Sequence, residues 1–193
     1  MKFSIKFISA ALLTATLSTQ LSACIPIVVG GAAAGGAMAA DRRTSGIYLE
    51  DENIELKASK NIQDAIGEIG HVNVTSYNLN VLLTGEVPNE AEKKRAETIA
   101  KKTANVRSVT NELVMTRKTE VSSRGNDIYL TSKVKAKFLA DGRFAANAVK
   151  VVSENSVVYL MGIVSHAEAQ YATEIASNTD GVIKVVKVFE YND

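Results

Sequence analysis

Two short apolar stretches of nearly the same pattern decide the fold. They are Val81-Leu82-Leu83-Thr84-Gly85-Glu86-Val87 and Val158-Tyr159-Leu160-Met161-Gly162-Ile163-Val164. Each is a run of strand length that is rich in apolar residues, and each carries a glycine at its fifth position. A glycine in a strand predicts a bulge or a close approach of neighbouring backbone. Because the pattern occurs twice, we expect a duplicated structural unit.

The repetition extends on both sides of these stretches. Downstream, the apolar residues Ala91, Ala96, Ile99 and Ala100 recur as Ala167, Ala172, Ile175 and Ala176. Upstream, Ala58-Ile62-Ile66 matches Leu130-Val134-Phe138, which places a five-residue insertion in the first loop of the second copy. The two copies span residues 50–117 and 126–193, and the polar segment 118–125 is interpreted as a linker.

Each copy has the pattern helix, strand, strand, helix, strand. Apolar residues four positions apart predict a first helix with one buried face. The turns Asn78-Leu79-Asn80 and Glu154-Asn155-Ser156 join alternating segments and predict two hairpins. Alanine-rich helices follow at about 89–104 and 165–178, before a last alternating strand. The fold class is therefore α+β.

The N-terminus has the organisation of an export signal. Lys2 and Lys6 precede or flank an uncharged apolar run, and Leu21-Ser22-Ala23-Cys24 ends in small residues. These four residues resemble the bacterial lipobox, which implies a signal peptide at 1–23 and an acylated Cys24. Residues 24–49 would then be the lipidated cysteine with a Gly/Ala-rich tether. The alternatives are a chance cysteine beside a plain cleavage site, an uncleaved membrane span, or a small-residue helix-packing segment.

Composition excludes several classes of function. The chain of 193 residues has 22 Lys and Arg against 21 Asp and Glu, which argues against a general nucleic-acid binder. One cysteine and two histidines exclude a disulfide framework and a Cys- or His-rich metal site. No nucleophile elbow, phosphate loop or dinucleotide fingerprint is present in the sequence. We expect no enzyme activity, no metal, no cofactor and no small-molecule substrate.

The duplicated unit resembles a known family. The resemblance lies in Val72–Tyr77, Val81–Gly85, Pro88-Asn89, Asp127–Val134 and Leu160–Gly162. Two such units after a lipobox are similar to the dual BON-domain outer-membrane lipoproteins of the division- and outer-membrane-stress-associated phospholipid-binding type.

The resemblance carries expectations for structure and function. It implies two tandem BON domains, each α-β-β-α-β with a three-stranded mixed sheet packed against two helices. It also implies anionic phospholipid binding of the phosphatidylglycerol type by the second unit, a role in outer-membrane integrity, and localisation to division sites. By resemblance to Gram-negative lipoproteins, Ile25 after the cysteine implies the periplasmic face of the outer membrane. Where the family commonly has Trp, this chain has Tyr129.

The first helix of the second unit has an apolar face that its core does not need. In the segment 128–140, Leu130, Val134 and Phe138 form the buried face. At about 100° per residue, Tyr129, Ser132, Ala136 and Leu139 lie opposite them. An apolar stripe flanked by lysines is suited to lying on an anionic bilayer. The candidate phospholipid-binding residues are Tyr129, Ser132, Lys133, Lys135, Ala136 and Leu139.

With the upstream match above, the first copy has Lys57, Lys60, Asp64 and Gly67 at these positions. That copy is expected to pack against its partner unit or another protein rather than to enter a membrane. Two alternatives remain at this stage. Tyr129 and Leu139 could pack under a neighbouring unit, and Phe144 fits either the core or the bilayer.

Two rival functions also remain. The first is a periplasmic protein-interaction module that assists outer-membrane protein assembly and so contacts the assembly machinery. The second is a component of a secretion or adhesion system.

Overall fold

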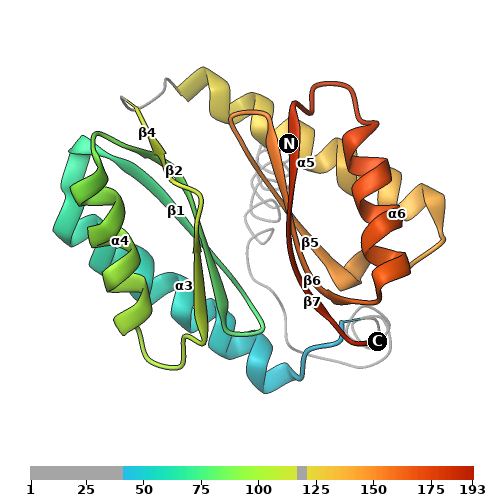
Figure 1. Ribbon diagram of the computed structural model, residues 1–193, viewed down its shortest axis with the longest axis horizontal. Helices are drawn as coiled ribbons and strands as arrows, with labels where there is room; N and C mark the ends of the chain where they lie inside the picture. The colour runs from blue at the N-terminus through green and yellow to red at the C-terminus, as the bar shows by residue number, and fades with distance from the viewer. Residues whose placement is uncertain (1–40, 117–120) are drawn as a thin grey trace, which may run out of the picture. The chain divides into compact units, whose positions relative to one another are not determined.

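The computed structural model describes residues 41–116 and 121–193 (Figure 1). The predicted signal peptide, Cys24 and most of the tether lie outside the described residues. The first repeat contains α3 (Ser45–Ile66), the 3-10 turn η1 (Gly67–Ile69), β1 (His71–Tyr77), β2 (Asn80–Val87), α4 (Glu90–Lys102), β3 (Ser108–Asn111) and β4 (Val114–Met115). The second contains α5 (Val121–Asp141), η2 (Ala146–Ala148), β5 (Val149–Glu154), β6 (Val157–Val164), α6 (His166–Ser177) and β7 (Lys184–Tyr191).

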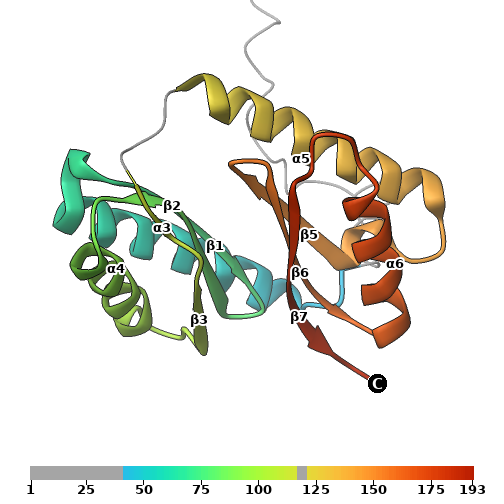
Figure 2. The same ribbon diagram turned by 45° about the horizontal axis from the view of Figure 1, so that its top comes forward.

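Both repeats have a mixed sheet. In the first, β1 pairs antiparallel with β2, and β2 pairs in parallel with β3 and with β4. In the second, β5 pairs antiparallel with β6, which pairs in parallel with β7. Figure 2 shows α3 and α4 on one face of the first sheet, and α5 and α6 on one face of the second. The predicted α+β class and the order helix, strand, strand, helix, strand are confirmed.

The last strand differs between the repeats. It is continuous in β7, whereas in the first repeat it is divided at Glu112 and Leu113. The pairing register is unchanged across this gap, because Leu83 faces Asn111 and Glu86 faces Val114. The Leu113 N–H donates to the Asn111 side chain, and the Leu113 side chain is buried in the core.

Each repeat has its own hydrophobic core between its helices and its sheet. Helix α3 contributes Ile54 and Ile62 to the first core, and α5 contributes Leu130, Val134 and Phe138 to the second. Phe144 belongs to the second core as well: it is 8% exposed, and its ring meets that of Phe138 edge-on with centroids 5.1 Å apart. The structure thus assigns Phe144 to the core rather than to a membrane-facing position.

One aspartate near the start of each first helix holds the hairpin turn of its repeat. Asp51 accepts the backbone N–H groups of Asn78 and Leu79, each at 2.8 Å. Asp127 accepts those of Asn155 and Ser156, each at 2.9 Å. All four turn residues have positive φ, as the tight hairpin turn that follows strand twist requires. Both predicted hairpins are confirmed.

These aspartates correct the alignment of the two copies. Because Asp51 and Asp127 are equivalent, Ile54, Ala58 and Ile62 correspond to Leu130, Val134 and Phe138. The predicted match was therefore wrong by one helical turn. The helices are offset by 76 residues and the hairpins by 77, so the insertion is of one residue instead of five. Apolar spacing of four recurs at every turn, which is why the pattern alone permitted the wrong register.

The corrected alignment also changes the comparison of the helix surfaces. The positions on α3 that match Tyr129, Ser132, Ala136 and Leu139 are Asn53, Leu56, Lys60 and Gln63. Leu56 is 70% exposed, so the first repeat does present one large apolar side chain there. The remaining three positions are polar, and α3 has no continuous apolar stripe along this line.

The two strand glycines allow close backbone packing. A Cβ atom at Gly85 would lie 2.1 Å from the carbonyl oxygen of His71, and one at Gly162 would lie 2.4 Å from that of Ala148. Real Cβ contacts are never so short, so a side chain at either position would force the neighbouring backbone apart. Close backbone approach is the explanation that the structure supports for both.

The described residues of both repeats belong to one compact unit. Apolar residues of the two sheets form a shared cluster around Tyr77, Leu82, Tyr159 and Met161. Side-chain hydrogen bonds also join the two sheets, and the Asn73 amide, for example, donates to Glu154 at 2.7 Å. Helix α5 begins at Val121, inside the segment that the sequence assigned to the linker.

Candidate membrane-binding site

Helix α5 presents a stripe of exposed apolar side chains. Tyr129 is 65% exposed and Leu139 is 71% exposed, while Leu130, Val134 and Phe138 on the opposite face are buried. Ser132 and Ala136 lie between the two large residues and are also exposed. Tyr129 and Leu139 therefore do not pack under a neighbouring unit, which was the alternative explanation for them.

Ile128 is a further member of this surface that the sequence prediction did not include. Its side chain is 70% exposed, and it stands four residues before Ser132 and eleven before Leu139, on the same helical face. The Ser132 hydroxyl donates to the Ile128 carbonyl at 3.0 Å, so this polar group is satisfied within the helix. The spacing from Leu139 was visible in the sequence and could have identified Ile128.

The two candidate lysines have different surroundings. The Lys133 ammonium donates to the backbone carbonyl of Asp180 at 3.1 Å and to its carboxylate at 3.3 Å. Lys135 is exposed and has no hydrogen bond or ion pair to any described residue. Lys135 is thus the more available cation, while Lys133 joins α5 to the loop before β7.

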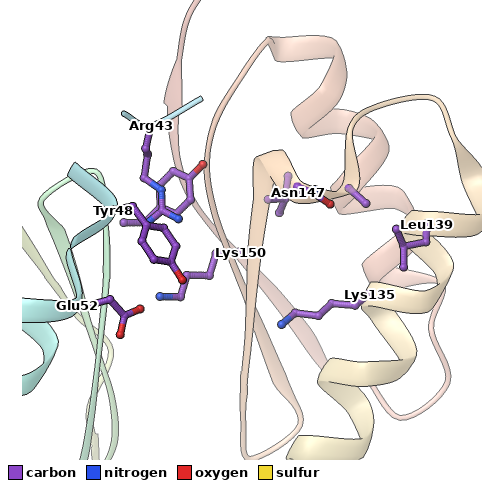
Figure 3. A pocket seen from close by; sticks show the side chains of 10 residues that line it. Arg43, Tyr48, Glu52, Lys135, Leu139, Asn147 and Lys150 are labelled. Atoms are coloured by element: carbon purple, nitrogen blue, oxygen red, sulfur yellow. The ribbon is translucent and has the colours of Figure 1, made fainter. Parts of the chain in front are cut away.

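A cavity of about 400 Å³ adjoins the stripe (Figure 3). Lys135, Leu139 and Asn147 line it from the second repeat, and Tyr48 and Glu52 line it from α3. In the figure, Lys135 extends from α5 toward the side on which Tyr48 and Glu52 lie.

Arg43 forms one end of the cavity and is fully paired. It donates to Asp41 at 2.7 Å and to Asp51 at 2.8 Å, and its guanidinium lies 4.1 Å from the centroid of the Tyr77 ring. Burial opposes the charge on Arg43, but the hydrogen bonds that Arg43 donates to the two carboxylates outweigh it and raise the pKa of Arg43. Burial also raises the pKa of Tyr77, which keeps its hydroxyl neutral.

The described residues were also compared with the requirements of a histidine site, a metal site and a membrane-spanning helix. The Nδ1 atom of His166 lies 2.7 Å from a carboxylate oxygen of Asp193, and the His166 ring stacks on that of Tyr191. The described residues contain no group of three His, Cys, Asp or Glu side chains that could hold a metal ion. Among the same residues, no helix combines the length and the apolar character needed to cross a membrane.

Comparison with known proteins gives consistent results. The BON domain family matches residues 50–117 and 126–193. The chain is 43% identical over 186 residues to the outer membrane lipoprotein DolP of Haemophilus influenzae, and the match covers 95% of each protein. It is 36% identical to a 21 kDa hemolysin of Actinobacillus pleuropneumoniae, covering 78% and 79% of the two chains. The osmotically-inducible protein Y of Escherichia coli is 33% identical, covering 72% of both.

Among solved structures, a type III secretion protein of Chlamydia trachomatis, CdsD, matches 69% of this chain and 91% of its own. The identity is 15% and the TM-score 0.26, a likeness too weak to support an argument. The two BON matches and the near full-length identity to DolP are decisive. The chain belongs to the BON-domain family, as a dual-BON lipoprotein of the DolP type.

Proposed function

We propose that this protein is a non-enzymatic outer-membrane lipoprotein that binds anionic phospholipid through α5 of its second BON domain. The observation that supports this is the stripe of Tyr129, Leu139 and Ile128, three large apolar side chains held in solvent on one face of a helix. The lipobox at Cys24 and the near full-length similarity to an outer-membrane lipoprotein support the proposal of a lipid anchor in the outer membrane, at its periplasmic face.

Burial of the stripe would supply the binding energy. Transfer of a large apolar side chain out of water contributes about 1.5–3 kcal/mol when burial is complete. A helix lying in the bilayer interface buries only its outer face, so the three side chains together give a weak to moderate affinity. Lys135 adds an attraction to anionic headgroups of about 1 kcal/mol.

The lipid anchor compensates for this moderate affinity. Acyl chains on Cys24 would keep the protein at the membrane. The tether would thus raise the effective concentration of α5 at the lipid surface, so that a moderate affinity is enough for contact. In this arrangement the anchor retains the protein and α5 responds to lipid composition. Localisation to division sites and a role in outer-membrane integrity, which the family resemblance implies, are part of the same proposal.

The test uses the fragment 41–193, which contains both hydrophobic cores and lies within the compact unit that includes both repeats. It should bind vesicles that contain phosphatidylglycerol, and not vesicles of phosphatidylcholine alone. Leu139→Glu puts a charge in the stripe, and we expect it to reduce the affinity by tenfold or more. Co-sedimentation with vesicles and NMR shifts along α5 are the measurements.

Leu56→Glu is the matched control, because Leu56 has the same exposure on the corresponding helix of the first repeat. It should leave binding unchanged. If the fragment ignores anionic vesicles, or if both variants bind like the parent, α5 is not a lipid-binding helix. A periplasmic protein-interaction module that docks a polypeptide on the stripe would then be the better account.

A further inference from the structure

The cavity beside the stripe has walls from both repeats, and this bears on which lipid the site accepts. Leu139 and Lys135 belong to α5, whereas Tyr48 and Glu52 belong to α3 of the first repeat. Leu139 contributes both to the exposed stripe and to the lining of the cavity. A lipid whose acyl region meets the stripe would thus have its polar headgroup at the mouth of this cavity.

Two of the four charged side chains that line the cavity form ion pairs within the protein. Arg43 is neutralised by Asp41 and Asp51. The Lys150 ammonium donates to Glu55 at 2.7 Å and to the Ser76 carbonyl at 3.2 Å.

Lys135 and Glu52 remain. Neither of them has a hydrogen bond or an ion pair to another residue within the described ranges. Lys135 carries a positive charge and donates hydrogen bonds, whereas Glu52 carries a negative charge and accepts them. The two side chains come from opposite walls of the cavity.

This pair defines the chemistry of a complementary headgroup. The ammonium of Lys135 requires an anionic oxygen, and the carboxylate of Glu52 requires a hydrogen-bond donor. A phosphodiester that carries a hydroxyl or ammonium group on its headgroup has both in one molecule. A headgroup with a carboxylate would be repelled by Glu52, and one with no donor would gain no hydrogen bond from it.

We propose that Glu52 of the first repeat completes the lipid site and selects phosphodiester headgroups that donate hydrogen bonds. In this arrangement Lys135 binds the phosphate, Glu52 accepts from the headgroup, and Leu139 contacts the acyl region. The inference rests on the proposed lipid-binding function. It adds that the first repeat, which has no continuous stripe of its own, determines headgroup selectivity.

The decisive experiment compares two lipids of equal charge. Phosphatidylmethanol has the same single negative charge as phosphatidylglycerol but no donor on its headgroup. We expect the fragment 41–193 to bind phosphatidylglycerol vesicles about tenfold more tightly, as suits a hydrogen bond to a charged group. Glu52→Ala should abolish this preference while leaving binding to both lipids measurable.

The control variant is Glu90→Gln, which removes a carboxylate on α4 that does not line the cavity. It should keep the full preference for phosphatidylglycerol.

A third set of vesicles, with phosphatidylmethanol in a phosphatidylethanolamine background, distinguishes which headgroup supplies the hydrogen-bond donor. Recovery of Glu52-dependent binding there would show that an ethanolamine ammonium serves as well as a glycerol hydroxyl.

Equal binding of the parent to phosphatidylglycerol and phosphatidylmethanol would overturn the selectivity proposal and leave lipid binding by α5 intact. A preference that persists in Glu52→Ala would also overturn it. Failure to bind either lipid would overturn the proposed function itself. The two proposals therefore fail in different ways.

Discussion

Asp51 and Asp127 each satisfy two backbone N–H groups in a hairpin turn of positive φ. Both carboxylates are almost completely buried. Each also lies at the same height on its helix, so one side chain sets both the turn geometry and the register between helix and sheet. Asp51 additionally accepts from Ser76 and pairs with Arg43, which leaves Asp127 as the simpler of the two to test.

Asp127→Ala should destabilise the protein. Loss of the carboxylate leaves two N–H groups of the turn at Asn155 and Ser156 without their acceptor, and a buried unsatisfied group costs about 1–3 kcal/mol. We expect the free energy of unfolding to fall by about 2–3 kcal/mol, measured by urea denaturation. Asp64→Ala, on the exposed surface of α3, is the control and should change it by under about 0.5 kcal/mol. Equal effects of the two would contradict the role assigned to Asp127.

Helix α5 has three faces, and each makes a different kind of contact. Leu130, Val134 and Phe138 form the core face, and the stripe faces solvent. The third face contacts the segment between α6 and β7. Lys133 donates hydrogen bonds to Asp180, and Lys137 donates one to the carbonyl of Asn178 at 2.9 Å. A lysine on this third face is engaged within the protein, whereas Lys135 on the other side of the stripe is available to a ligand.

Lys135→Gln and Lys133→Gln form a matched pair on one helix. We expect Lys135→Gln to reduce affinity for anionic vesicles about fivefold and to weaken its salt dependence, since one surface cation is worth about 1 kcal/mol. Lys133→Gln should change vesicle binding by less than about twofold. Titration at two salt concentrations measures both. A larger effect of Lys133→Gln would show that its contact with Asp180 breaks at the membrane.

The segment before α3 forms hydrogen bonds with the second repeat, and so links the two halves of the molecule. The Arg42 guanidinium donates to both carboxylate oxygens of Glu168 at 2.7 Å, and to the carbonyl of Ile163 at 2.7 Å. Bidentate pairs of this kind are the stronger surface ion pairs. Burial in the sheet-to-sheet cluster raises the pKa of Tyr159 to about 12, so this interface keeps a neutral phenol up to high pH.

The Arg42–Glu168 pair should make stability depend on pH. The hydrogen bonds from Arg42 lower the pKa of Glu168 below its ordinary 4.5. A lowered pKa means that the contribution is complete above about pH 4.5 and disappears as the pH falls through the folded-state value. We expect Glu168→Gln to cost about 1 kcal/mol at neutral pH, after allowance for partial exposure, and less in acid.

Urea denaturation of the parent and of Glu168→Gln from neutral pH down to about pH 3 measures this difference, across the ordinary titration range of a glutamate. Arg42→Ala should give the same convergence of the two curves in acid. A difference between parent and variant that stays constant over the whole range would show that the pair contributes no pH-dependent stability.

The sequence alone determined the duplication, both hairpins, the α+β class and the apolar face of α5, because these depend on local periodicity and turn chemistry. That periodicity identified the apolar candidate residues Tyr129, Ala136 and Leu139 on α5, but it was not followed back to Ile128. The register of the first helices became clear from contacts between helix and hairpin, since apolar spacing of four fits several registers and the hydrogen bonds of Asp51 and Asp127 fit one.

The tertiary structure also separated Lys133 from Lys135 and brought Glu52 to the cavity. These outcomes rest on contacts between residues far apart in the chain, and helical periodicity carries no information about partners beyond the helix.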